Sequence, residues 1–197
     1  LAHINGTYAP KDRTVERILL ARQDDLVVNM LVVCGKKEFL ICSHEDPINE
    51  SYRWIDRYID PSSRAHVVFG MGFAFHLEVL ITSFKNTKVI IIEPNMDLFY
   101  QLLTVRNYEL IILNSEILVD EGIDFILGRL NKLFWDTEKG GIQCQPFDVY
   151  AEMFHDRWDE LKTRFIKQVE SFTVDMSTRR FFGDLWIHNN IKNADRL

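Results

Sequence analysis

The chain has 197 residues, of which 47% are hydrophobic and 12% aromatic, enough to bury one substantial core. Its 23 Lys and Arg and 29 Asp and Glu residues give a formal net charge of −6. Because nucleic acids and anionic membranes are polyanions, this charge excludes a general surface for either, and only a local basic patch stays open. The apolar runs are too short to cross a bilayer and no signal peptide opens the chain, so we expect a cytoplasmic protein.

The first part of the chain is predicted to form a turn, a short helix and a β-hairpin. Residues 5–12 are typical of a turn, and residues 14–23 of a short amphipathic helix. Residues 27–33 and 38–43 are predicted to pair as a hairpin, with Gly35 supplying a positive φ between them.

A second helix is predicted to begin at Pro47. Asp46 suits the N-cap position and Pro47 the first helical position. Apolar residues then recur at helical spacing, which predicts one buried face. The residues of this face are Tyr52, Ile55, Tyr58 and Ile59.

From residue 66, predicted strands and helices alternate, which indicates an α/β fold with a mainly parallel, Rossmann-like sheet and helices on both faces. The predicted strands are 66–69, 88–92, 109–113 and 141–145. The predicted helices are 74–84, 96–105, 119–134 and 148–172. The last helix carries an apolar stripe of the kind that packs on a core. The stripe consists of Val149, Met153, Phe154, Trp158, Leu161, Phe165, Ile166 and Val169.

These elements divide the chain into three predicted parts. Residues 1–62 form the hairpin and helix region, 63–175 the Rossmann-like domain, and 176–197 a helical linker toward a further domain. The chain begins at Leu1, which is not Met, and its last residues still read as a helix. We therefore expect a piece of a longer protein.

A glycine turn follows the first buried strand, in the stretch HVVFGMGFAFHLEVL. Dinucleotide-binding folds carry GxGxxG here, so that the backbone approaches the pyrophosphate and the helix packs closely on its strand. Gly70 and Gly72 fit this pattern, but Phe75 takes the place of the third glycine, which argues against NAD. Glu93 lies 23 positions after Gly70, where a carboxylate could accept hydrogen bonds from a ribose. Gly70, Gly72 and Glu93 are thus the candidate cofactor-binding residues, and a purely structural turn is the alternative.

The remaining candidates for chemistry favour structural roles. His76 lies in an apolar helical stretch, which is more typical of a partly buried histidine than of a catalytic base. His155, Asp156 and Asp159 would supply half a metal site, and a solvated helix face is the favoured interpretation. No catalytic residue and no resident metal is predicted, because no GxSxG, HExxH, P-loop or paired-carboxylate motif occurs.

The cysteines also favour a structural role. Cys34, Cys42 and Cys144 are odd in number, widely spaced and never set as CxxC. This pattern fits neither a disulfide framework nor a zinc cluster. We expect buried, reduced thiols.

Three stretches of the chain are informative together: ICSHEDPINESYRWI, then VVFGMGFAFHLEVL with VIIIEPN, and TRRFFGDLWIHNNIKN. In this order they resemble the N-terminal region of the motility accessory factor (Maf) family of flagellin glycosyltransferases. The matching residues are Ser43, Asp46, Pro47, Glu50, Gly70, Gly72, His76, Glu93, Pro94, Phe182, Gly183, Trp186, Asn190 and Asn193. The resemblance spans roughly residues 30–193, and Cys42 departs from it where a histidine is expected.

The resemblance implies transfer of a nonulosonic acid, a sialic-acid-like sugar, from a CMP-activated donor to Ser or Thr of flagellin. The family's donor domain carries a GxGPS-like turn that this sequence lacks, so the resemblance implies a non-catalytic N-terminal domain with no cofactor of its own. Flagellin is then the expected partner, and self-association stays open.

Two other functions compete with this interpretation. The spacing of Gly70, Gly72 and Glu93 also resembles S-adenosylmethionine-dependent methyltransferases, although their acid ahead of the first glycine is replaced by Val68 and Phe69. A pure protein-interaction module would keep the fold without a pocket, with Phe73 or Phe75 lying across the turn.

Overall fold

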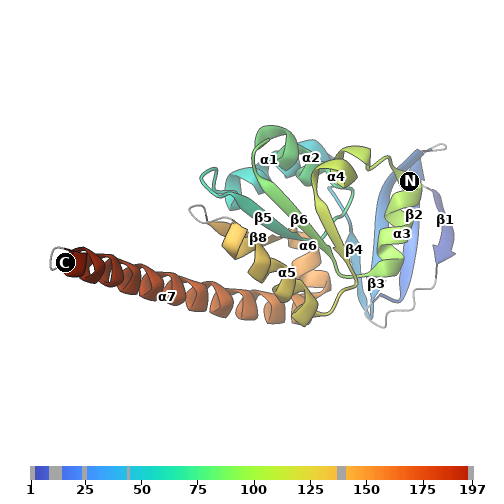
Figure 1. Ribbon diagram of the computed structural model, residues 1–197. Coiled ribbons are helices and arrows are strands. Elements are labelled where there is room, and N and C mark those ends of the chain that lie inside the picture. Colours follow the sequence, from blue (N-terminus) through green and yellow to red (C-terminus); the bar gives the residue numbers. More distant parts are fainter. Residues whose placement is uncertain (1–2, 9–14, 24–25, 44, 137–140, 195–197) are drawn as a thin grey trace.

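The structure, a computed structural model, describes residues 3–8, 15–23, 26–43, 45–136 and 141–194. It contains a parallel sheet with helices on both faces, a smaller antiparallel sheet formed by the N-terminal strands, and a long C-terminal helix that extends beyond the α/β body (Figure 1). The predicted α/β class is confirmed.

The parallel sheet has four strands in the order β7-β6-β5-β8. They are β5 (Ala65–Phe69), β6 (Lys88–Glu93), β7 (Glu116–Val119) and β8 (Ile142–Pro146). Every residue of β5 is buried, because this strand has neighbours on both sides and helices on both faces. β6 and β7 follow β5 on one side of the sheet and β8 lies on the other side of β5. The order in which the strands are added therefore reverses between β5 and β8, which makes this the topological switch point. In sheets of this kind ligands bind outside the carboxyl ends of the strands at such a switch point.

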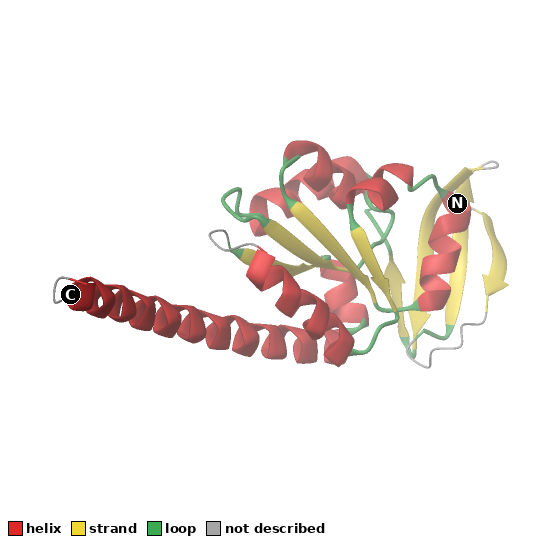
Figure 2. Cartoon of the chain, in the orientation of Figure 1, coloured by secondary structure: helices red, strands yellow, loops and turns green. Residues whose placement is uncertain are grey.

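Helices cover both faces of this sheet. They are α1 (Pro47–Tyr58), α2 (Phe75–Ser83), α3 (Met96–Val105), α4 (Glu109–Asn114), α5 (Ile123–Asp136), α6 (Asp148–Met153) and α7 (His155–Ala194). Figure 2 shows α1, α2 and α4 on one side of the sheet, with α5 and α7 on the other. The predicted start of α1 is confirmed, since the Asp46 side chain accepts a hydrogen bond from the Asn49 amide at 2.8 Å. The predicted face was wrong in part: Trp54 is buried, whereas Tyr52 is 55% exposed.

The antiparallel sheet contains the predicted hairpin. Its strands are β1 (His3–Tyr8), β2 (Arg17–Gln23), β3 (Leu26–Cys34) and β4 (Lys37–Leu40), in that order. Gly35 has a φ of 59° in the β3–β4 turn, as predicted. The predicted helix over residues 14–23 was wrong in its described part, because residues 17–23 form β2, which pairs with β3 between Leu26 and Val33. Residue 14 lies outside the described part of the chain. Residues 5–8 of the predicted turn belong to β1, and residues 9–12 lie outside the described part of the chain.

The third strand of the parallel sheet was predicted at the wrong apolar run. Residues 109–113 form most of α4, and the strand is β7, which begins at Glu116 and pairs with β6. Ile111 packs inward from α4, whereas Leu113 is 73% exposed, so the run is amphipathic as a helix.

The predicted helix over residues 148–172 is divided at Phe154 into α6 and α7, and these two helices carry most of the predicted stripe as buried residues. Trp158, Leu161 and Phe165 are buried, and Phe165 packs against Phe134 of α5 with ring centroids 5.8 Å apart. Ile166 is the exception and is largely exposed. α7 continues without interruption through residues 175 and 176, and the division of the chain there stays a prediction. Within the described ranges, no helix is both long and apolar enough to span a membrane.

Candidate functional site

The fold brings the three candidate cofactor residues together at the switch point. Gly70 and Gly72 lie directly after β5, and Glu93 is the last residue of the neighbouring β6. The segment that follows β8 lies against them, because β8 is the other neighbour of β5. Both glycines have a positive φ, 107° at Gly70 and 51° at Gly72, which side-chain-bearing residues rarely adopt.

The amides of the glycine turn are already bonded to protein acceptors. The Gly70 amide donates to the Ile92 carbonyl at 2.8 Å and the Met71 amide to Glu93 Oε2 at 3.2 Å. The Gly72 amide donates to the Tyr150 hydroxyl at 3.1 Å. In nucleotide-binding folds, amides of this turn donate to phosphate oxygens. Here the protein itself takes up these three donors.

Tyr150 of α6 fills the space above the turn. Its side chain is completely buried, and a Cβ built on Gly70 would lie 2.3 Å from its Cγ, so ring and glycine are in direct contact. Its hydroxyl accepts the Gly72 amide and donates to the Glu93 carboxyl group. Phe147 covers Gly72 in the same way, with its ring 3.3 Å from a Cβ built there. Tyr150 and Phe147 thus fill the space directly above the two glycines.

Glu93 is a buried structural group in this arrangement. It is fully inaccessible, and its carboxyl group accepts from the amides of Met71 and Asn95, both at 3.2 Å, as well as from Tyr150. Burial raises the pKa of Glu93 to about 8, and the hydrogen bonds and the charge of Arg157 oppose this only in part. The side chain is therefore mostly protonated at neutral pH. A ribose could reach it only if Tyr150 moved away.

His76 stabilises the opposite side of the turn. It is buried, and its Nε2 lies 3.3 Å from the Gly70 carbonyl, to which it donates as a neutral imidazole. Its ring stacks on Phe147 with centroids 4.0 Å apart and planes at 3°. Burial lowers the pKa of His76 to about 3, which removes it as a base at neutral pH. The predicted burial of His76 is confirmed, and its structural role stays a prediction.

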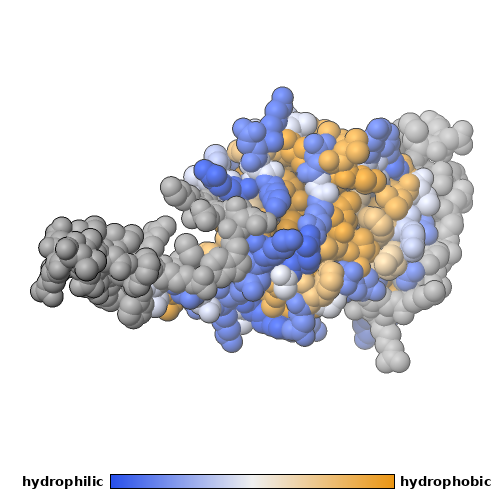
Figure 3. Space-filling model, viewed as in Figure 1, coloured by the Kyte–Doolittle hydropathy of each residue, from blue (hydrophilic) through white to orange (hydrophobic). Residues whose placement is uncertain are grey.

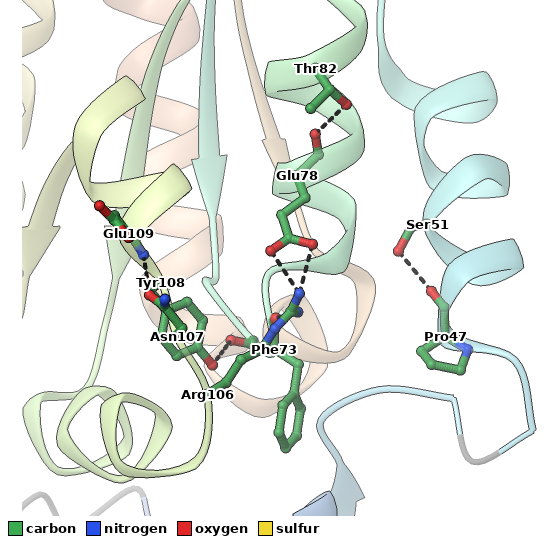
Figure 4. A network of polar contacts seen from close by, with 10 residues as sticks. Pro47, Ser51, Phe73, Glu78, Thr82, Arg106, Asn107, Tyr108 and Glu109 are labelled. Carbon is green, nitrogen blue, oxygen red and sulfur yellow. Dashed lines mark hydrogen bonds and ion pairs between the residues drawn. The ribbon is translucent and has the colours of Figure 1, made fainter.

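A salt bridge holds the outer side of the turn (Figure 4). Arg106, which follows α3, donates to both oxygens of Glu78 on α2 at 2.6 Å and also to the Phe73 carbonyl. Its guanidinium lies 4.1 Å from the centre of the Phe75 ring. Phe75 thus faces Arg106, and the residues above the glycines are Tyr150 and Phe147 rather than the expected Phe73 or Phe75.

Other predicted candidates are not part of this site. His155 Nε2 lies 3.1 Å from an Asp156 carboxylate oxygen and both side chains are exposed, which agrees with a solvated helix face. No group of three or more metal-binding side chains occurs in the described residues. Cys42 is buried and Cys34 and Cys144 are partly buried, and all three are thiols.

The role of Tyr150 was not predicted from the sequence. Tyr150 directly follows Val149, the first residue of the predicted apolar stripe, and its contact with Gly70 arises only in the folded structure. The one signal in the sequence is a large polar aromatic residue at the start of the helix that follows the last strand.

The surface outside the turn includes exposed apolar side chains over α3 and α4 (Figure 3). They are Met96, Tyr100, Leu103, Leu110, Ile112 and Leu113. Groups of exposed apolar side chains occur at protein–protein contacts.

The fold and its closed turn define an α/β domain of Rossmann-like type whose switch point is filled by its own side chains. The sequence model of the Glycosyltransferase Maf N-terminal domain matches residues 28–137, and the chain belongs to this family. No curated protein matches the sequence.

Two solved structures show weak similarity. The MAf glycosyltransferase from Magnetospirillum magneticum AMB-1 aligns with a TM-score of 0.39 and 13% identity, over 72% of this chain and 31% of that one. A probable spermidine synthase from Corynebacterium glutamicum ATCC 13032 aligns with a TM-score of 0.35 and 15% identity, over 62% of this chain and 47% of that one. The chain thus spans less than half the length of either protein, and the family assignment rests on the sequence match.

Proposed function

We propose that this chain is the non-catalytic N-terminal domain of a Maf-type flagellin glycosyltransferase. It serves as a scaffold or as a docking surface for the acceptor, flagellin, in the cytoplasm. The whole enzyme transfers a nonulosonic acid to Ser or Thr of flagellin, and the CMP-activated donor is bound outside this chain.

The closed glycine turn is the observation that carries the non-catalytic role. Tyr150 contacts Gly70 and donates to Glu93, so the position at which Rossmann-like domains hold a nucleotide is taken by protein atoms. The family match supports the glycosyltransferase context. A methyltransferase is not favoured, because it would need the amides of the turn and the Glu93 carboxylate for its cofactor, and both are engaged within the protein.

A transfer assay tests the proposal directly. The chain is incubated with a CMP-nonulosonic acid and flagellin, and flagellin is analysed by intact-mass spectrometry. We expect no mass increase above that with heat-denatured chain, since the proposal places the donor site outside this chain. Sugar transfer that scales with the concentration of the chain would contradict the non-catalytic role.

A binding experiment separates the two non-catalytic roles. Flagellin is immobilised and the chain is passed over it with and without the CMP-sugar. Saturable binding that is independent of the donor is expected for acceptor docking, and no binding is expected for a scaffold.

A further inference from the structure

A pocket of about 570 Å³ lies at the edge of the parallel sheet opposite to the glycine turn, where β6 and β7 begin. Its walls come from the turn between α2 and β6, the end of α4 and one side of α5. We call it the β6–β7 pocket. None of its lining residues belongs to the closed site around Glu93.

Positive charge gathers around this pocket. Four cationic side chains line it, whereas Glu116 is the one carboxylate among the lining residues, so the lining carries a net charge of three. The four cations are Lys85, Lys88, Arg129 and Lys132. Glu116 and Arg129 are paired with each other, because Glu116 accepts from Arg129 Nε at 2.8 Å and from a terminal guanidinium nitrogen at 2.6 Å, so the excess positive charge is that of the three lysines. This local excess contrasts with a net charge of −6 for the whole chain.

Stabilisation of helix ends explains only part of this arrangement. Lys85 follows the end of α2, where a cation interacts favourably with the carbonyls of the helix end, whereas Lys132 lies before the last turn of α5. Stabilisation of a helix end by a lysine does not require that lysine to line a cavity. Here Lys85 and Lys132, from separate elements, line one concave space whose wall also includes the largely exposed Leu113 and the buried Val89.

We propose that the β6–β7 pocket binds a small phosphate-bearing molecule with an apolar part, such as a nucleoside phosphate. The volume lies in the range of pockets that enclose small ligands, and the cations suit a group with two or more negative charges. The apolar wall favours a ligand that carries a ring beside its phosphate. A long polyanion fits less well, because it needs an extended basic track and would meet the acidic remainder of the chain.

Titration calorimetry at low salt tests the proposal, with inorganic pyrophosphate and uridine 5′-diphosphate as separate probes. We expect both to bind and the nucleotide to bind more tightly. The double variant Lys85→Gln with Lys132→Gln should weaken both by roughly tenfold or more, because hydrogen bonds to charged groups are lost. The matched control is Lys36→Gln with Lys37→Gln, which removes the same charge from exposed positions at the β3–β4 turn. This control should leave both affinities unchanged.

Three results would overturn the proposal. The first is no binding of either probe at about 1 mM. The second is an equal loss in the pocket and control variants, which would indicate a general effect of charge. The third is binding of heparin without binding of pyrophosphate, which would assign the lysines to an extended polyanion. Nucleotide binding that is lost in Glu93→Gln and kept in the lysine variant would contradict the closed glycine turn instead, so failures of the two proposals are distinguishable.

Discussion

Replacement of Gly70 by Ala is expected to destabilise the fold by about 4 kcal/mol. A methyl group at this position would lie 2.3 Å from Cγ and 2.7 Å from Cβ of Tyr150, which is well inside van der Waals contact. In addition, the φ of 107° is strained for any residue with a side chain. Tyr150 has no space to retreat, because it is fully buried and bonded to both Gly72 and Glu93. Urea denaturation followed by circular dichroism measures the change in the free energy of unfolding.

Gly128→Ala is the matched control for this experiment. Gly128 lies in the interior of α5, and a Cβ built there meets no atom within 4 Å. Since alanine has the higher helix propensity, this variant should be stabilised by roughly 0.5–1 kcal/mol. A loss below about 1 kcal/mol in Gly70→Ala would show that Tyr150 does not press on the turn as described.

The free energy of unfolding is expected to fall as the pH rises from about 4.5 to about 8, because of Glu93. Burial raises the pKa of this carboxyl group from 4.5 to about 8 in the folded protein, so between these values the folded state keeps a proton that the unfolded state has released. Each pH unit in this window then lowers the free energy of unfolding by about 1.4 kcal/mol through Glu93 alone. Below this pH window Glu93 is protonated in both the folded and the unfolded state, so its contribution to the free energy of unfolding is fully present and no longer changes with pH.

Glu93→Gln isolates this effect. Glutamine has the same shape and does not titrate, so the difference in the free energy of unfolding between the wild type and the variant should shift steadily toward the variant as the pH rises. The exposed Glu152 on α6 offers a control of the same chemistry, and Glu152→Gln should follow the wild-type profile. A wild type and a Glu93→Gln variant with parallel profiles from about pH 5 to about pH 8 would contradict the raised pKa.

The fold could be predicted from the sequence where local patterns and tertiary pairing agree. The buried strand before Gly70 and the capped start at Asp46 are both confirmed, since each depends on residues next to one another in the chain. Residues 109–113 were misassigned because a short apolar run fits a strand and a half-buried helix equally well. Only the pairing of β7 with β6 decides between them. Residues 14–23 fit a helical pattern, but pairing with β3 makes residues 17–23 a strand.

The residues of the candidate site could be predicted from the sequence, but the closure of the glycine turn and the raised pKa of Glu93 could not. Gly70, Gly72 and Glu93 meet as their spacing predicted, because consecutive parallel strands end at the same edge of the sheet. The group that closes the turn comes from residue 150, and a contact over this separation leaves no periodic signal in the sequence. The raised pKa of Glu93 depends in turn on its burial in the folded protein, and the hydrogen bond from Tyr150 opposes the rise.

Titration calorimetry of the chain with S-adenosylmethionine at neutral pH tests whether the glycine turn is closed, since this cofactor would need the amides of the turn and the Glu93 carboxylate. With Tyr150 in place, we expect no heat of binding for the wild type, and none for Glu93→Gln. Micromolar binding to the wild type that Glu93→Gln abolishes would contradict the account, because it would show an open cofactor site where we describe a closed one.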